Sequence, residues 1–177
     1  TITTTGANSH GISLDASTAG SIPDLTLRNF NINAVGAGSN GTFFYSKSSW
    51  FFSNNTLIYD SIINSSGTNF VISGSNSNGN YTLVNVTFMQ NTSVITGATS
   101  LNLSRYWYLD VLVNTPWGIP LNASLFIYNN EKSLIYSGSS EKDGKLSVIL
   151  QEYYQNNSAK TDLNPYLIQV SYNNYSV

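Results

Sequence analysis

Apolar residues along this chain fall into short runs with strand-like patterns. No stretch of about 11 residues or more places apolar side chains at the i, i+3, i+4 and i+7 positions of an amphipathic helix. Runs rich in Val, Ile, Leu, Tyr and Phe alternate instead with clusters of Gly, Asn and Ser, which is typical of strands joined by turns. The sequence therefore predicts an all-β protein.

Three runs in the first part of the chain resemble one another. They are Leu25–Ile32, Thr56–Ile63 and Thr82–Phe88. Aligning Asn29, Asp60 and Asn85 gives separations of 31 and 25 residues, and a weaker run follows at 100–104. A repeat of roughly twenty to thirty residues with Asn or Asp at a fixed turn position is typical of a parallel β-solenoid, in which the turn residues can stack as ladders. An antiparallel sandwich with coincidental similarity among the runs is the alternative.

The second part of the chain alternates apolar and polar residues with period two. Residues 106–113 place Trp107, Leu109, Val111 and Val113 on one face. The same alternation recurs at Ala123, Leu125 and Ile127, at Leu146, Val148 and Leu150, and at Tyr166, Ile168, Val170 and Tyr172. Turn signals separate these strands at Gly118-Ile-Pro120 and Asp143-Gly144. One buried and one wet face is typical of a sandwich.

Composition also changes near residue 104, because ten of the 13 glycines lie before residue 100 and most tyrosines lie from Tyr106 onward. We therefore expect two domains, residues 1–104 and residues 105–177.

Several short motifs of the second part carry a family resemblance. They are Trp107-Tyr-Leu-Asp-Val111, Gly118 to Ala123, Asp143-Gly144, Leu150 to Tyr153 and Asn164-Pro-Tyr166. In this order they resemble the Ig-like (carboxypeptidase-regulatory-like) β-sandwich that follows right-handed β-helix repeats in archaeal cell-surface proteins. Asn85-Val-Thr-Phe88 resembles the helix repeat itself. The resemblance implies a short right-handed parallel β-helix over 1–104, an Ig-like antiparallel sandwich over 105–177, and scaffolding or adhesion at the cell surface without catalytic residues.

Charge and cysteine content fit an extracellular protein. Charged residues make up 9% of the chain, against roughly 25% in an average soluble domain. The net charge of −2 gives no electrostatic footprint for nucleic acid. Disulfides, thiolate metal sites and cysteine nucleophiles are excluded because the chain has no cysteine. No apolar run reaches the roughly 18 residues that span a bilayer, and no leader-like segment opens the chain, so we expect a mature or trimmed segment without a membrane span.

Asn-X-Ser/Thr triplets are frequent, and each is a candidate acceptor for a covalent N-glycan. They begin at Asn40, Asn54, Asn64, Asn80, Asn85, Asn91, Asn102, Asn122, Asn156 and Asn174. With 24 asparagines, and serine or threonine at 43 of 177 positions, about six triplets are expected by chance, so ten is a moderate excess. Asn85 and Asn102 are the weaker candidates, because a solenoid turn or core would bury them.

The residues that enzymatic chemistry on a β-scaffold needs are sparse. The first part of the chain offers three acids, Asp15, Asp24 and Asp60, and none of them forms an Asp-x-Asp or Asp-Asp pair. His10 is the single histidine, which leaves no histidine pair for zinc, and we expect it to be a solvated turn residue. We therefore expect no enzyme, no metal and no cofactor.

The second part shows five confident strands between Tyr106 and Tyr172, against about seven in a complete sandwich of this type. An open sheet edge invites strand addition from another chain. A β-prone segment without an evident partner opens the sequence: Thr1, Ile2, Thr3, Thr4 and Thr5. We therefore expect a head-to-tail homo-oligomer assembled by donor-strand complementation through these residues, as in the archaeal filaments called threads. Strands within 114–121 or 151–162 that complete the sheet are the alternative.

The function expected from these features is structural: a subunit of a glycosylated extracellular filament or surface layer. A cell-surface adhesin or glycan-binding module, using Trp50-Phe-Phe52 or the tyrosines as a sugar platform, is the alternative function.

Overall fold

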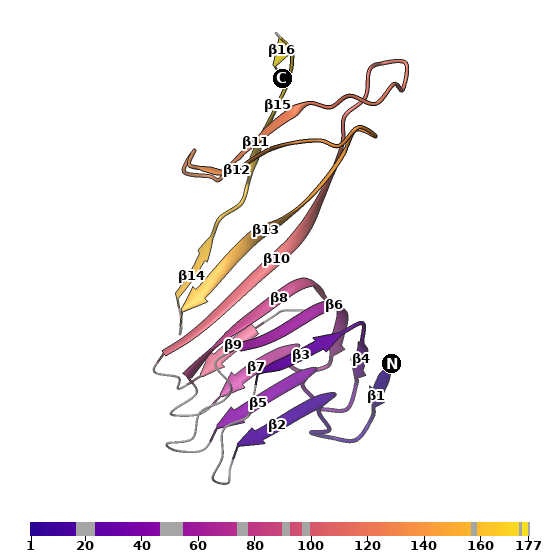
Figure 1. Ribbon diagram of the computed structural model, residues 1–177. Coiled ribbons are helices and arrows are strands. Elements are labelled where there is room, and N and C mark those ends of the chain that lie inside the picture. The colour runs from indigo at the N-terminus through magenta and orange to yellow at the C-terminus, as the bar shows by residue number, and fades with distance from the viewer. Residues whose placement is uncertain are drawn as a thin grey trace. The chain divides into compact units, whose positions relative to one another are not determined.

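The computed structural model of the 177-residue chain describes residues 1–16, 24–46, 55–73, 78–89, 93–96, 100–156, 159–173 and 175–176 (Figure 1). Within these ranges the secondary structure is all strand and turn, which confirms the all-β prediction. The strands cluster into two compact units. We call Thr1–Tyr106 with Tyr154–Thr161 the N-terminal unit, and Trp107–Tyr153 with Asp162–Val177 the C-terminal unit.

Parallel strands build the N-terminal unit. Its strands are β1 (Ile2–Thr4), β2 (Ile12–Ala16), β3 (Leu25–Arg28), β4 (Asn31–Ala34), β5 (Thr42–Ser46), β6 (Asn55–Ser65), β7 (Phe70–Ser73), β8 (Asn78–Phe88), β9 (Ser93–Thr96) and the start of β10 (Ser100–Leu112). One sheet runs β1-β4-β6-β8-β10, with β3 also beside β6, and a second runs β2-β5-β7-β9. Each pass of the chain therefore places its strands beside those of the pass before.

Successive passes become shorter along the chain. In the first sheet the paired residues are 30 apart at Ile2↔Ile32, 25 apart at Thr56↔Tyr81 and 22 apart at Ser100↔Asn78. In the second sheet the separation falls from 30 between β2 and β5 to 28 between β5 and β7, and then to 23 between β7 and β9.

The three similar runs of the sequence are neighbours in this ladder, at the separations that their alignment predicts. β3 pairs with β6 at 31 residues and β6 with β8 at 25. Asn29, Asp60 and Asn85 all adopt left-handed backbone conformations, with φ of 55°, 49° and 53°. Asn and Asp tolerate this region better than other residues with a side chain because their short polar groups hydrogen-bond locally. The Asn85 Nδ2 donates to Asp60 Oδ1 over 2.8 Å, so the expected stacking of turn residues is confirmed for this pair.

Side chains on either side of these bends form the core of the N-terminal unit. Fully buried aliphatic residues are Ile32, Ile58, Ile63, Ile72, Leu83, Leu101 and Leu103. Phe44, Phe70 and Tyr81 form an aromatic cluster, with ring centroids 5.4 Å apart for Phe44–Phe70 and for Phe44–Tyr81. The Tyr81 hydroxyl is buried and has no hydrogen-bond partner among the described residues.

The left-handed bend does not recur in β10. Continuing the β8–β10 register places Trp107 at the position of Asn85, 22 residues later. A bulky aromatic residue is strained at positive φ, and β10 instead continues as one strand to Leu112. The chain therefore leaves the parallel ladder where the Asn/Asp position is lost.

Antiparallel strands dominate the C-terminal unit. They are β11 (Ser124–Tyr128), β12 (Leu134–Ser139), β13 (Lys145–Asn156), β15 (Leu167–Tyr172) and β16 (Tyr175–Ser176), with β14 (Ala159–Asp162) beside β13. One sheet runs β12-β11-β15-β16, and β10 lies next to β13. The predicted inward row on β11 is confirmed, because Ala123, Leu125 and Ile127 are buried. Turns form where they were predicted, with Gly118 and Gly144 both at a φ of 79°.

We predict that Asn85→Ala destabilises the protein by about 2 kcal/mol, because alanine is strained at positive φ and the bond to Asp60 is lost. Asn85→Gly is the matched control: it loses the same bond but accepts the backbone angle, so it should cost less. Urea unfolding of the three proteins measures the difference. Equal costs for the two variants would show that the backbone angle is unimportant here.

We predict that Tyr81→Phe raises stability by about 1 kcal/mol, because it keeps the aromatic packing and removes a buried, unpaired hydroxyl. Burial also raises the pKa of Tyr81 above its ordinary value near 10. The unfolded chain therefore ionises this hydroxyl at lower pH than the folded chain, and stability is lost as pH rises above 10. Urea unfolding at pH 9 and pH 10.5 should show a smaller alkaline loss for Tyr81→Phe. An equal loss in both proteins would contradict this assignment.

Candidate assembly surface

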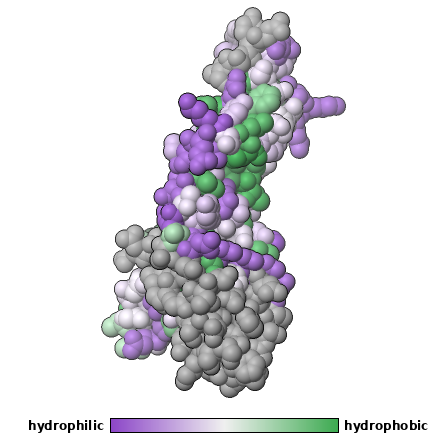
Figure 2. Space-filling view, turned by 90° about the vertical axis from the view of Figure 1, so that its left-hand side faces the viewer, coloured by the Kyte–Doolittle hydropathy of each residue, from purple (hydrophilic) through white to green (hydrophobic). Residues whose placement is uncertain are grey.

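The C-terminal unit exposes an unusual share of its apolar side chains. Of the 13 large hydrophobic residues that are exposed in the described part of the chain, nine lie in this smaller unit. They are Tyr108, Leu112, Trp117, Ile119, Leu134, Ile135, Ile149, Leu167 and Tyr172. Figure 2 shows apolar side chains gathered in a band on one face of this unit. Clustered exposed apolar surface is typical of interaction sites rather than of free surface.

The strand β10 has an open edge within this unit. Its pairing with β8 ends at Tyr106, and from Trp107 onward β13 is its partner among the described strands. Burial changes along the same strand: the inward Leu101 and Leu103 are 0% exposed, whereas Leu109 and Val111 are only half-buried. The second half of β10 therefore lacks the cover that the first half has.

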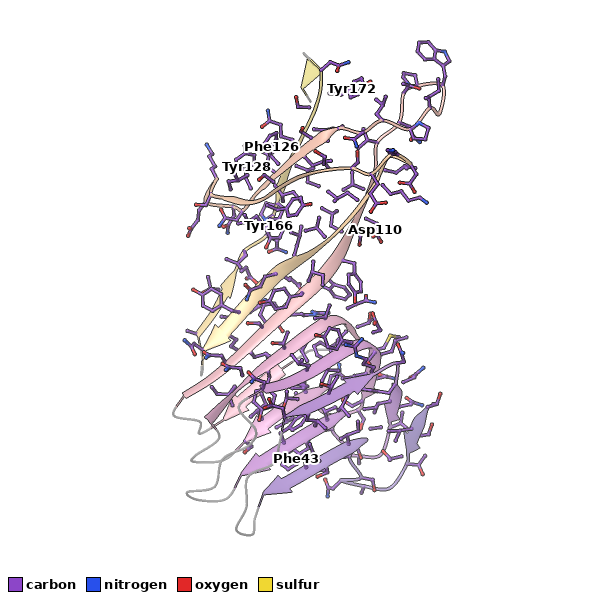
Figure 3. All side chains as sticks on the ribbon, in the orientation of Figure 1. Phe43, Asp110, Phe126, Tyr128, Tyr166 and Tyr172 are labelled. Carbon is purple, nitrogen blue, oxygen red and sulfur yellow. The ribbon has the colours of Figure 1, made fainter. Side chains whose placement is uncertain are left out.

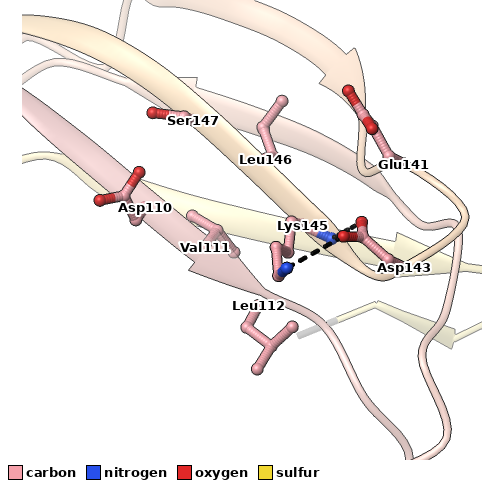
Figure 4. Close-up of a pocket in the computed structure, with 8 residues that line it drawn as sticks. All are labelled: Asp110, Val111, Leu112, Glu141, Asp143, Lys145, Leu146 and Ser147. Carbon is pink, nitrogen blue, oxygen red and sulfur yellow. Dashed lines mark hydrogen bonds and ion pairs between the residues drawn. The ribbon is translucent and has the colours of Figure 1, made fainter.

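A hollow of about 590 Å³ lies beside the end of β10 (Figure 4). Its lining consists of Asp110, Val111, Leu112, Glu141, Asp143, Lys145, Leu146 and Ser147. Asp143 accepts a hydrogen bond from the Lys145 backbone N–H and pairs with its Nζ at 3.1 Å. The backbone bond, followed by the side-chain bond, lowers the pKa of the Asp143 carboxyl. The two charges of this pair thus satisfy each other, while apolar side chains remain exposed in the hollow.

The other sheet of this unit also presents apolar side chains outward. Phe126 and Tyr128 extend from β11, as Figure 3 shows. Cross-strand pairing places Tyr128 between Leu134 on β12 and Leu167 on β15, and both leucines are exposed. This row forms a second apolar surface on a strand face that already has partners on both sides.

Trp107 and Glu152 meet in a smaller hollow of the same unit. The Trp107 Nε1 donates to Glu152 Oε2 over 2.7 Å, and the Leu163 backbone N–H donates to the Glu152 carbonyl. Tyr166, labelled in Figure 3, donates its hydroxyl to the Gln151 carbonyl. The hollow measures about 240 Å³ and is lined in addition by Tyr108, Leu109, Leu150 and Asn164. An indole, a carboxylate and an amide around one small space are the groups that sugar-binding sites use.

The structure corrects the interpretation of the first five residues. Thr1–Thr5 were expected to lack a partner within their own chain, yet β1 pairs with β4 in parallel at Ile2↔Ile32, Thr3↔Asn33 and Thr4↔Ala34. A three-residue strand carries too little pattern to reveal this pairing in the sequence. β1 is an end strand of its sheet, so β4 is its one strand neighbour among the described residues.

Seven of the ten candidate glycosylation asparagines lie in the described part of the chain, while Asn54, Asn91 and Asn174 lie outside it. Asn80, Asn102, Asn122 and Asn156 are exposed, and Asn40, Asn64 and Asn85 are half-buried. The Nδ2 atom that would carry the glycan donates a hydrogen bond to the neighbouring pass in three cases: Asn64 to Asn33, Asn85 to Asp60 and Asn102 to Asn80. The structure therefore separates exposed candidates from those whose amide already takes part in a ladder.

The acids and the histidine that the sequence singled out have structural partners. Asp24 accepts from the Asn55 backbone N–H, and Asp60 accepts from Asn85. His10 is not a solvated turn residue, as we had expected: its Nδ1 accepts from the Asn40 backbone N–H, and its ring stacks on Phe43 at 4.6 Å. The side chain of Asp15, and residues 50–52 with the predicted sugar platform, lie outside the description. Among the described residues, no three His, Cys, Asp or Glu side chains gather into a metal site.

No described helix has the length and apolarity to cross a lipid bilayer. No protein-family model, curated protein or solved structure matches this chain.

Sequence reasoning missed two features of this surface. The exposed loop at Trp117 was interpreted as an ordinary turn, although an indole between Pro116 and Gly118 has no adjacent strand alternation to bury it. β14 falls in the 151–162 segment, where a completing strand was the alternative expectation, but its four residues are all exposed.

We predict that glycan occupancy follows exposure of the amide group. Chain isolated from its natural source should carry glycans at Asn122 and Asn156, whose exposed amide groups make no hydrogen bond within the described residues, and should be bare at Asn85. Mass spectrometry of glycopeptides tests each site directly. Occupancy at Asn85 with bare Asn122 and Asn156 would contradict the prediction.

Proposed function

We propose that this protein is a structural subunit of a glycosylated extracellular filament or surface layer that assembles head-to-tail through strand addition. The observation that carries the proposal is the open edge of β10 from Trp107 to Leu112, with half-buried core residues and exposed apolar side chains beside it. A monomer that keeps such an edge exposed risks uncontrolled pairing, so proteins usually cover it or use it.

The proposed architecture is a short right-handed β-helix followed by an Ig-like sandwich. Parallel passes in register and the Asn85–Asp60 ladder support the first part. The antiparallel sheet around β11 and the separate β10–β13 pair support the second part. The sequence resemblance to archaeal surface proteins points the same way.

The donor strand in this assembly is β1 of a neighbouring copy. β1 is paired with β4 on one side, so it can keep that pairing and add its other edge to β10 of the next copy. Residues 107–112 span about 20 Å at roughly 3.3 Å per residue, which is long enough for the Thr1–Thr5 segment. Addition of this strand would cover Leu109 and Val111 and give β10 a partner on both sides. The surface is rich in amides and hydroxyls and poor in charge, so assembly should depend little on salt.

The second candidate function is a glycan-binding module or adhesin. It is favoured by the hollow around Trp107, Glu152 and Tyr166, whose aromatic and polar groups suit a single sugar unit. A monomer that binds polysaccharide, with loss of binding in Glu152→Ala, would favour this function over the filament.

We predict that the double variant Tyr108→Lys/Leu112→Lys abolishes assembly. Both side chains are exposed on β10, so lysines there should leave the fold intact while placing two charges beside the incoming strand. The matched control is Leu134→Lys/Leu167→Lys, which adds the same charges to equally exposed positions of the other sheet. Electron microscopy and light scattering of the concentrated proteins report polymer length.

Wild-type and control polymers with a monomeric β10 variant support the proposal. A wild-type protein that stays monomeric at millimolar concentration, or polymers in the β10 variant, would overturn it.

A further inference from the structure

The loop from Asn114 to Pro120 holds a tryptophan away from the protein in a fixed conformation. Trp117 is 84% exposed, and Ile119 beside it is also exposed. The Thr115 backbone N–H donates to the Ile119 carbonyl over 2.8 Å, and the Gly118 N–H donates back to the Thr115 carbonyl over 2.9 Å. A bridge between Asn114 and Pro120 closes the base of the loop.

The backbone of this loop is prepared for removal from water. The Ile119 N–H donates to Thr115 Oγ1, and the Leu121 N–H donates to the Val113 carbonyl. Two further positions, Pro116 and Pro120, have no N–H to satisfy. Burying the loop against a partner would therefore leave few backbone groups unpaired, and the fixed loop has little conformational entropy to lose. Tryptophan is among the residues most enriched as anchors at protein interfaces.

A hollow on the N-terminal unit matches this anchor in chemistry and size. It measures about 460 Å³ and lies on the outward side of β1, β4 and β6, lined by Thr1, Thr3, Asn31, Asn33, Ile62, Asn64 and Met89. Ile62 and Met89 are 43% and 62% exposed, which is unusual in a unit whose core is otherwise sealed. Pockets of roughly 300–1,000 Å³ accommodate ring systems larger than an indole.

We propose that Trp117 of one copy inserts into this hollow on the next copy, between Ile62 and Met89. A methionine thioether packs well against an aromatic ring, and the Asn and Thr side chains of the rim offer oxygen acceptors for the indole N–H. The loop and the hollow are both uncharged, whereas the hollow beside β10 carries Asp110, Glu141, Asp143 and Lys145, whose desolvation would oppose entry of an indole.

This contact deepens the proposed head-to-tail assembly and rests on it. A projecting group on one surface and a hollow on a different surface of the same chain make a heterologous contact, which extends into open polymers. The loop follows β10 directly in the chain, and the hollow contains Thr1 and Thr3 of β1. Strand addition and tryptophan insertion would therefore belong to one interface. A glycan on Asn64 would fill the hollow, so this asparagine must be bare in the polymer.

Engineered cysteines test the contact directly, because the chain has none of its own. Ile119→Cys places a thiol next to Trp117, and Asn31→Cys places one on the rim of the hollow, and neither removes an apolar contact residue of the hollow. Mixing the two variants under mild oxidation should give a disulfide-linked dimer, detected by mass. The matched control pairs Asn31→Cys with Leu134→Cys, an exposed position on another surface of the C-terminal unit, and should give at least tenfold less product.

A second variant measures the importance of the anchor. Trp117→Ala should raise the protein concentration needed for polymerisation at least tenfold while leaving the urea unfolding midpoint unchanged, because the indole makes little contact within its own chain. Polymers of wild-type length in Trp117→Ala, without a disulfide-linked product from the Asn31→Cys and Ile119→Cys mixture, would overturn the tryptophan contact and leave strand addition standing. Loss of polymers in the β10 lysine variant alone would identify that case.

Two other outcomes also overturn the proposal. Glycan at Asn64 in natural polymers is one. Flotation of the protein with phosphatidylcholine vesicles that depends on Trp117, without the cross-link, is the other and would assign the loop to a lipid surface. Absence of both polymer and cross-link in otherwise wild-type protein would remove the proposed function as well.

Discussion

The N-terminal unit depends on one backbone constraint: every pass must bend at the same register position. Parallel strands stay in register only if each pass repeats the turn of its neighbour, and the turn found here needs a left-handed residue at Asn29, Asp60 and Asn85. The bond from Asn85 to Asp60 ties the two passes together at the bend itself. Since the bend fixes which residues face inward before and after it, Ile58 and Ile63 both reach the core from one strand, β6.

Loss of that bend produces the other half of the molecule. At Trp107 the chain has an aromatic residue in place of Asn or Asp, and β10 continues without turning. The same strand thus belongs to a sealed core at Leu101 and to an open one at Val111. A stable scaffold and an incomplete surface share one continuous strand, which suits a protein that must present an adhesive edge.

Much of this arrangement could be predicted from the sequence because it depends on repetition. The alignment of Asn29, Asp60 and Asn85 gave the register of three strands, since residues that can adopt positive φ are few and conspicuous. Period-two alternation likewise identified the buried row on β11. Features made by single contacts left no such signal. The partner of β1, the stacking of His10 on Phe43 and the exposure of Trp117 depend on neighbours distant in the chain or on a missing neighbour, and no local pattern encodes them.

The shortening of successive passes has a consequence for growth. Paired residues in the first sheet are 30 apart at the first pass and 22 apart at the last, so the two ends of the parallel ladder differ in circumference. Two wide ends or two narrow ends could in principle stack on each other, but a wide end and a narrow end present strands of different spacing. Repeated stacking of ladder on ladder, the geometry of amyloid, is therefore mismatched from the outset. Any polymer made from such tapered subunits is polar, and its two tips should elongate at different rates.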